Sequence, residues 1–334
     1  MDSFKYGDWN YKLENGNHEV DSPLEKTDSV FKYYRNTYYS QDAIKNQYLF
    51  CSHPYHLNDS MDCSELLWDF SNLSKGLYDK FYKQYEFEDH FEVDFEKEQK
   101  NGFQQIKFLF FNLITNNLGI ISLTTEPLHT LMWAHYSTEK GFMVELDRKK
   151  LFDNLKENNN EINNYAFFPI QYVERLESID FFSEDFGSPD VPFLYSAGIK
   201  VNDWCYENEW RFITYSKNYG IPNSILSPLP SVEGSNDRKV YYPKEAIKSI
   251  TLGKQFFNGN NVEEILDSLV FKLKPGDDLD FVNYIIENLS DKIFWCGEYE
   301  KERNFRRSAE RIEFEKLENN IFKVIRQKEG FYNK

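Results

Sequence analysis

The sequence lacks paired cysteines. Four cysteines occur in 334 residues, far apart, and no two form a Cys-x-x-Cys pair. Neither a disulfide framework nor a zinc ribbon is indicated, and a reducing cytoplasm fits best. Cys51, His53, His56 and Cys63 are close in sequence, but Cys-x-His-x-x-His matches none of the usual structural zinc spacings. We therefore expect no metal there.

A secretory signal and a membrane span are lacking as well. The first eight residues contain neither a basic region nor an apolar stretch. The most apolar run, Ile106–Leu123, is interrupted by Asn112, Asn116 and Asn117. We expect a cytoplasmic protein with no membrane partner.

Positive charge is scarce. Fifty-five acidic side chains against 39 basic ones give a net charge of −16, which disfavours general binding to duplex DNA. The densest basic cluster contains Arg303, Arg306, Arg307 and Arg311, and glutamates are interleaved with it at helical spacing. This pattern is typical of a solvated, ion-paired helix face.

Three common catalytic motifs are missing. The sequence has no Gly-x-Gly-x-x-Gly, no complete phosphate-binding loop and no Gly-x-Ser-x-Gly. Neither a Rossmann cofactor site nor a Walker-type triphosphate site is supported, and a serine triad would have no nucleophile elbow.

The composition is that of a folded protein with a large core. Hydrophobic residues make up 40% of the chain and aromatic residues 18%. Short strands and helices without regular alternation favour the α+β class, with a mixed, mainly antiparallel sheet flanked by helices. Expected strands lie at 30–35, 48–52, 119–124, 142–147, 169–173, 210–215, 240–242 and 249–253, with 169–173 as the partner of 142–147.

Three regions are predicted along the chain. Residues 1–29 form a polar N-terminal segment, a tail or a strap, and residues 30–256 form an α+β domain of catalytic type. Residues 257–334 form a mainly helical C-terminal extension, with helices at 261–273, 278–289 and 301–328. Within the middle region, 74–117 is mostly helical, and 220–236 is a long loop or lid.

Two short signals indicate helix starts. Ser40 can cap a short helix that continues through Gln47. Asp62 with Glu65 three residues later resembles a capping box, so a helix should follow it.

The segment Tyr206–Phe212 carries an unusual charge pattern. If it is one strand, Glu207, Glu209 and Arg211 share a face. Two neighbouring carboxylates repel, so one has a raised pKa unless a cation such as Arg211 or Arg35 compensates. The alternative is a structural ion pair on an exposed sheet face.

A second group of reactive side chains precedes the strand at 142–147. Trp133, His135, Tyr136 and Lys140 stand close together, although Leu128, Leu131, Met132 and His135 also fit a core stripe at helical spacing. Asn58-Asp59 alone is an ordinary turn dipeptide. The interpretation as a site depends on the combination.

Five motifs occur in order along the chain: Tyr34-Arg35, Phe50 to Asp62, Leu131 to Phe142, Trp204 to Arg211 and Ile250 to Gly253. Together they resemble an uncharacterised bacterial family, catalogued as domain of unknown function twenty-nine seventy-one. The resemblance covers about residues 30–256, and one departure is Asn58-Asp59-Ser60 where the family usually has Asn-Asp-Pro.

A fainter similarity is to ADP-ribosyltransferases. Their NAD sites join an early Arg or His, a Ser- or Tyr-bearing element and a later Glu-x-Glu, and Arg35, Ser52 or Tyr136, and Glu207-Asn208-Glu209 occur here in that order. The similarity implies that Glu209 stabilises the developing cation and that Glu207 serves the acceptor. Binding of NAD as substrate would involve Tyr34, Arg35, Ser52, Asn58, Asp59, Trp133, His135, Tyr136, Lys140 and Arg211.

The leading hypothesis is an NAD-consuming enzyme, an ADP-ribosyltransferase or NAD glycohydrolase in a toxin or phage-defence setting. Its partners would be a nucleotide-type small molecule and a protein or nucleic-acid acceptor. One alternative is a metal-dependent hydrolase of a phosphorylated or nucleic-acid substrate. Another is a non-catalytic ligand sensor or interaction module. In each case the site residues should converge on one concave site.

Overall fold

The computed structural model describes residues 2–14, 17–84, 94–115, 118–158, 162–183, 186, 190–216, 219, 238–258, 262–301 and 304–327. The predicted loop at 220–236 lies outside these residues. The strands of the main sheet are β4 (Ser29–Tyr34), β7 (Leu118–Thr124), β8 (Phe142–Asp147), β9 (Ile162–Pro169), β13 (Glu209–Ser216), β15 (Ile247–Leu252), β16 (Val262–Asp267), β17 (Val270–Leu273), β18 (Ile293–Lys301), β19 (Asn304–Glu318) and β20 (Ile321–Arg326).

The protein is α+β, as predicted, and its main sheet has 11 strands in the order β16-β17-β20-β19-β18-β15-β8-β4-β7-β13-β9. Only the pairing of β15 with β18 is parallel among these described strands. The predicted partner of β8 is wrong, because β4 and β15 flank this strand. The segment expected there forms β10 (Gln171–Val173), which pairs instead with β12 (Ile199–Val201).

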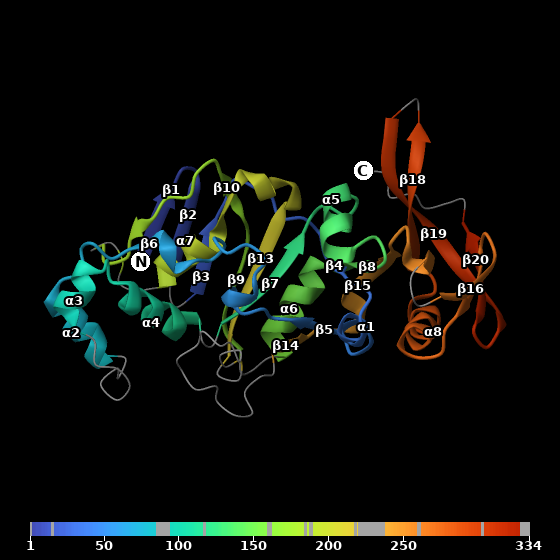
Figure 1. The fold of residues 1–334 in the computed structure, drawn as a ribbon, viewed down its shortest axis with the longest axis horizontal. Helices are drawn as coiled ribbons and strands as arrows, with labels where there is room; N and C mark the ends of the chain where they lie inside the picture. The colour runs from blue at the N-terminus through green and yellow to red at the C-terminus, as the bar shows by residue number, and fades with distance from the viewer. Residues whose placement is uncertain are drawn as a thin grey trace.

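Helices and small sheets surround the main sheet (Figure 1). The helices are α1 (Tyr38–Lys45), α2 (Lys75–Gln84), α3 (Phe95–Lys100), α4 (Gln104–Thr115), α5 (Thr130–Met132), α6 (Arg148–Asn158), α7 (Asp190–Gly198) and α8 (Asp277–Leu289). The remaining strands are β1 (Asp2–Tyr6), β2 (Trp9–Glu14) and β3 (Asn17–Asp21), β5 (Tyr48–Phe50) with β14 (Lys239–Tyr241), and β6 (Trp68–Asp69) with β11 (Ile179–Asp180). No helix in the described ranges is both long enough and apolar enough to cross a bilayer.

The middle of the main sheet is buried on both faces. Ile120 and Ile121 are neighbours on β7, yet they belong to two different apolar clusters, and Phe212 and Ile213 on β13 are divided in the same way. This division follows from the alternation of side chains along a strand. Helices α1, α6 and α8 contribute to one cluster, and α2, α4 and α7 contribute to the other.

The N-terminal segment is more ordered than a tail or strap. Strands β1, β2 and β3 form an antiparallel sheet. Trp9 and Tyr11 of β2 are buried, and the Tyr11 hydroxyl donates a hydrogen bond to Gln171 Oε1 at 2.8 Å. Aromatic side chains within this polar segment therefore anchor it to the domain.

The helical prediction for the C-terminal region is wrong except at α8. Residues 262–273 form the hairpin of β16 and β17, and residues 304–326 form β19 and β20. These strands continue the main sheet at the end opposite α2 and α3 (Figure 1). Ile312 and Phe314 alternate with glutamates, and Asn319-Asn320 separates the two strands. The alternation is a strand signal and the asparagine pair is a hairpin signal. The helical prediction gave more weight to the helical spacing of the charges.

The predicted cap of α1 is also wrong. The helix starts after Thr37, whose side chain accepts the Ser40 N–H at 3.3 Å. Threonine and serine are both good caps, so the sequence alone did not distinguish them.

Candidate functional site

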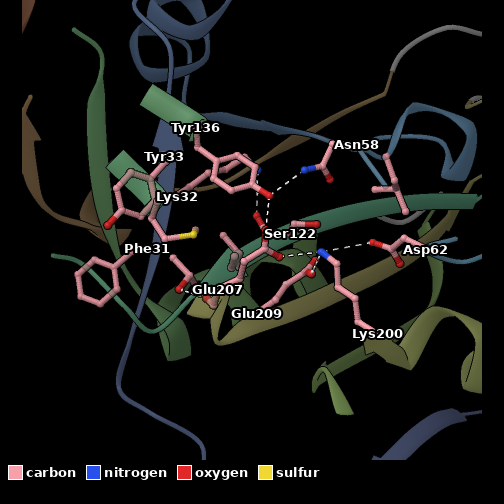
Figure 2. Close-up of a pocket in the computed structure, with 14 residues that line it drawn as sticks. Phe31, Lys32, Tyr33, Asn58, Asp62, Ser122, Tyr136, Lys200, Glu207 and Glu209 are labelled. Carbon is pink, nitrogen blue, oxygen red and sulfur yellow. Dashed lines mark hydrogen bonds and ion pairs between the residues drawn. The ribbon is translucent and has the colours of Figure 1, made fainter. Parts of the chain in front are cut away.

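The site lies where two central strands diverge. Strands β4 and β7 pair only at Phe31 and Thr124. Beside this point is a cavity of about 100 Å³, here called the inner pocket (Figure 2). Its lining residues are Phe31, Lys32, Tyr33, Leu57, Asn58, Asp62, Ser122, Leu123, Thr124, Met132, Tyr136, Lys200, Glu207 and Glu209.

The two glutamates reach the inner pocket from different elements. Glu209 is the first residue of β13, whereas Glu207 ends the 3-10 helix Asn202–Glu207. Asn208 between them is left-handed, with φ of 40°, a conformation that asparagine tolerates better than most residues. The prediction of one continuous strand is therefore wrong, although both carboxylates line the same pocket.

Lys200 joins the acidic side chains. Its Nζ lies 2.7 Å from Glu207 Oε2, 3.4 Å from Glu209 Oε2 and 3.7 Å from Asp62 Oδ2 (Figure 2). At most 5% of any of these four side chains is exposed. Solvent screens such ion pairs little, so their mutual positions are strongly coupled.

Arg211 completes this group, which we call the charge cluster: Asp62, Lys200, Glu207, Glu209 and Arg211. The Arg211 guanidinium bonds Asp62 through two nitrogens, at 2.7 and 2.5 Å, and its Nε donates to Glu209 Oε1 at 2.8 Å. Three carboxylates thus face two cations in a buried setting. Asp62 does not begin a capping box, because Ser64 caps the 3-10 helix Glu65–Leu67.

The two glutamates have opposite pKa shifts. Burial raises the pKa of Glu207, and the Glu209 charge adds to this shift although Lys200 opposes it. Burial would also raise the pKa of Glu209, but Arg211 and Lys200 outweigh it and lower that pKa well below its usual value. Near neutral pH, Glu209 is therefore held ionised, and Glu207 is the stronger base.

Tyr136 lies between Glu207 and Asn58 and bonds both side chains. Its phenol donates a short hydrogen bond to Glu207 Oε1 and accepts one from Asn58 Nδ2 at 2.9 Å (Figure 2). Burial raises the pKa of Tyr136, and the Glu207 charge adds to the effect. The phenol therefore stays protonated and donates to Glu207.

Lys32 is a second lysine at the inner pocket, beside Lys200. Its Nζ donates to the Ser122 carbonyl oxygen of β7 at 3.0 Å, across the divergence of the two strands. Burial lowers the pKa of Lys32 to about 8, although the Glu209 charge opposes the shift. Within the described ranges, no ion pair joins Lys32 to a carboxylate.

Replacing Lys32 with methionine should remove a pH-dependent part of the stability. The folded protein releases this proton near pH 8, whereas an unfolded chain holds it to about 10.5. The unfolded state thus binds more protons between these values, so the Lys32 contribution to the free energy of unfolding rises with pH. Urea unfolding at both ends of this window should show wild type gaining stability relative to Lys32→Met. An equal difference at both pH values would contradict the shift.

A larger cavity of about 490 Å³, the outer cavity, adjoins the inner pocket through the shared side chains Tyr33, Asn58 and Tyr136. Arg35 at its wall is exposed, and its side chain makes no hydrogen bond or ion pair with the described residues. The outer cavity has the size of ordinary ligand sites, and the inner pocket holds only a small group. The remaining lining residues are Tyr34, Thr37, Ser40, His135 and Trp204.

Most predicted site residues come together around these two cavities. Glu207, Glu209, Asn58 and Tyr136 line the inner pocket, and Arg211 binds Glu209 from behind. Tyr34, Arg35 and His135 line the outer cavity, where the His135 Nδ1 lies 3.1 Å from the Tyr206 hydroxyl. Their roles toward a ligand stay predictions.

Besides Arg211, four predicted site residues line neither cavity. The Ser52 backbone pairs with Ile120, and the Asp59 side chain accepts the Met61 N–H within a turn. Trp133 is fully buried and donates to the Pro127 carbonyl oxygen at 3.0 Å. Lys140 is exposed.

The sequence argument missed Lys32, Asp62 and Lys200. Lys200 stands alone in an otherwise apolar run after Phe193, and Lys32 stands among aromatic residues on β4. A single charge within a buried segment is a usable signal, because proteins seldom bury a lysine without a partner or a function.

Residues 132–212 match the model of a family described as protein of unknown function DUF2971. This segment carries His135, Tyr136, Lys200, Glu207 and Glu209, and the match confirms the resemblance for the motifs that lie within it, at 132–142 and 204–211. Neither the curated proteins nor the solved structures contain a match, so a similarity to ADP-ribosyltransferases is not shown.

Proposed function

We propose that the protein cleaves the glycosidic bond of NAD, as an ADP-ribosyltransferase or an NAD glycohydrolase. The observation that carries the proposal is a pair of carboxylates, Glu207 and Glu209, that Lys200 bridges. The pKa of Glu207 is raised, whereas the pKa of Glu209 is lowered. In such a pair one carboxyl group transfers protons while the other stays ionised and stabilises positive charge. Enzymes that cleave glycosidic bonds use two carboxyl groups in this way.

Each glutamate takes one part of the reaction. As the ribose C1–nitrogen bond breaks, its electron pair leaves with nicotinamide, and positive charge develops on the ribose. The ionised Glu209 stabilises this charge. Glu207 accepts the proton of the attacking water or acceptor hydroxyl as the new C1–oxygen bond forms. Tyr136 and Lys200 hold Glu207 in place through their hydrogen bonds.

The outer cavity supports a nucleotide-type substrate. Tyr34, His135 and Trp204 offer aromatic surface for a base, and Arg35 has free donors for a phosphate. The inner pocket, at about 100 Å³, admits a ribose edge and excludes a base. Our proposal includes the toxin or phage-defence role expected from the sequence, because an enzyme that consumes NAD would suit either role.

Nicotinamide release from NAD tests the proposal. The assay uses purified protein with and without a cell lysate, because the lysate supplies protein or nucleic-acid acceptors and any activator. Release above the background rate in either condition supports it. Absence of release in both conditions would contradict it.

Replacing Arg35 with alanine should weaken NAD binding. Loss of a charge-assisted hydrogen bond costs roughly 1.5–3 kcal/mol, which is about a 10- to 150-fold increase in Kd. Titration calorimetry with NAD measures the change. Arg175→Ala is the matched control, because Arg175 is an exposed arginine that lines neither cavity. Equal affinity of both variants would remove Arg35 from the site.

A further inference from the structure

Lys32 occupies an unusual position in the main sheet. Strand β4 pairs with β8 along six residues but with β7 at one residue only. The carbonyl oxygen of Ser122 on β7 is bonded by the Lys32 side chain. The amine therefore lies at the opening between the strands, where the inner pocket is formed.

The surroundings of Lys32 differ from those of Lys200. Lys200 has three carboxylates within 4 Å, and these raise its pKa against the effect of burial. Lys32 has the Ser122 carbonyl oxygen at 3.0 Å and the Tyr34 ring at 5.9 Å, and the Glu209 charge acts on it without an ion pair among the described residues. Phe31, Leu123 and Met132 give the same pocket an apolar lining. A desolvated lysine without a paired carboxylate is the form that acts as a nucleophile toward carbonyl groups.

We propose that Lys32 is a carbonyl-reactive amine that forms an imine with the C1 aldehyde of a reducing ribose phosphate, whose aldehyde end enters the inner pocket. Imine formation goes beyond glycosidic cleavage and does not depend on it. Only the choice of ribose as the sugar rests on the proposed function. Arg35 in the adjoining outer cavity is the group that would receive the phosphate.

The chemistry needs only groups at the pocket. The neutral amine adds its lone pair to C1, and one proton passes from the nitrogen to the former carbonyl oxygen to give a carbinolamine. A second proton transfer lets the hydroxyl leave as water, and the carbon–nitrogen double bond forms. Glu207 relays the protons, because its raised pKa makes it the stronger base of the pair: it accepts one from the nitrogen after addition and returns one to the leaving hydroxyl. Both Lys32 and Glu207 line the inner pocket.

Reductive trapping tests this inference on the full-length protein. The protein is incubated near neutral pH with ribose 5-phosphate and cyanoborohydride, which delivers hydride to the imine carbon and leaves a stable secondary amine. Peptide mass spectrometry then gives the labelling rate of each lysine. Lys32 should be labelled at least roughly tenfold faster than exposed Lys75 and Lys149, because more of it is neutral at this pH.

Controls come from the same digest. Lys200, which is ion-paired, should label more slowly than Lys75, and Lys32→Arg should lose the fast site without gaining another. If Lys32 served only to bridge β4 and β7, its buried ammonium would label no faster than the exposed lysines, and that result would overturn the inference. The wild-type ratio decides this even if the variant does not fold. Nicotinamide release is measured separately, so failure of either proposal is seen independently.

Discussion

Replacing Glu209 with glutamine is expected to abolish nicotinamide release while the protein remains folded. Glutamine keeps the size and the hydrogen-bonding shape but removes the charge opposite the developing cation, a loss worth at least about 100-fold in rate. Arg211 keeps its two bonds to Asp62, at 2.7 and 2.5 Å, so the charge cluster retains a counter-ion. The measurement is the initial rate of nicotinamide release, with circular dichroism to verify the fold.

Glu207→Gln is the matched comparison. It makes the same chemical change in the other glutamate of the pair, which is proposed to accept the proton of the acceptor hydroxyl. It should therefore reduce transfer to lysate acceptors more than simple hydrolysis of NAD. If Glu209→Gln were as active as wild type, glycosidic cleavage at this pair of glutamates would be abandoned, and metal-dependent hydrolysis would be tested next.

Replacing Arg211 with methionine should cause a large loss of stability. Arg211 is fully buried and bonds both Asp62 and Glu209. Methionine fills much of the same volume but leaves the three carboxylates of the charge cluster with Lys200 as their one remaining cation within it. Removal of one partner from a buried ion-pair network costs roughly 3–5 kcal/mol. Urea unfolding of both proteins near neutral pH gives the difference in the free energy of unfolding.

Lys75→Met is the control for this effect. Lys75 pairs with Asp79 at 2.8 Å on the surface of α2, and both side chains are at least half exposed. Such a pair contributes at most about 0.5 kcal/mol. A loss below about 1 kcal/mol for Arg211→Met would show that solvent reaches the charge cluster and that its ion pairs are weak.

The middle of the chain was predictable because its signals are local. Strands β4, β7, β8, β13 and β15 were expected within two residues of their observed bounds, since each is an apolar or alternating run next to a turn. The helical stretch of α2, α3 and α4 also follows its apolar spacing. The division into domains stays a prediction.

The C-terminal strands were not predictable from charge spacing. Arg307 and Arg311 with their neighbouring glutamates fit a helix face equally well. In the structure, Arg307 bonds Glu139 through two nitrogens at 2.7 Å, and Arg311 pairs with Glu313 on the same strand. Hydrogen bonds between β18, β19 and β20 outweigh the local helical preference, because tertiary pairing adds energy that no short window of sequence contains.

By itself, the sequence determined the α+β class and the order of the motifs. It also predicted a shared site, and four of the predicted residues, Glu207, Glu209, Asn58 and Tyr136, line the inner pocket. Only the tertiary structure decided which cations meet these carboxylates. Asp62 and Arg211 are 149 positions apart, and Lys32 reaches the pocket only because β4 and β7 diverge beside it. The charge on a buried carboxyl depends on the groups within a few ångströms of it, and those distances are set by how distant segments pack.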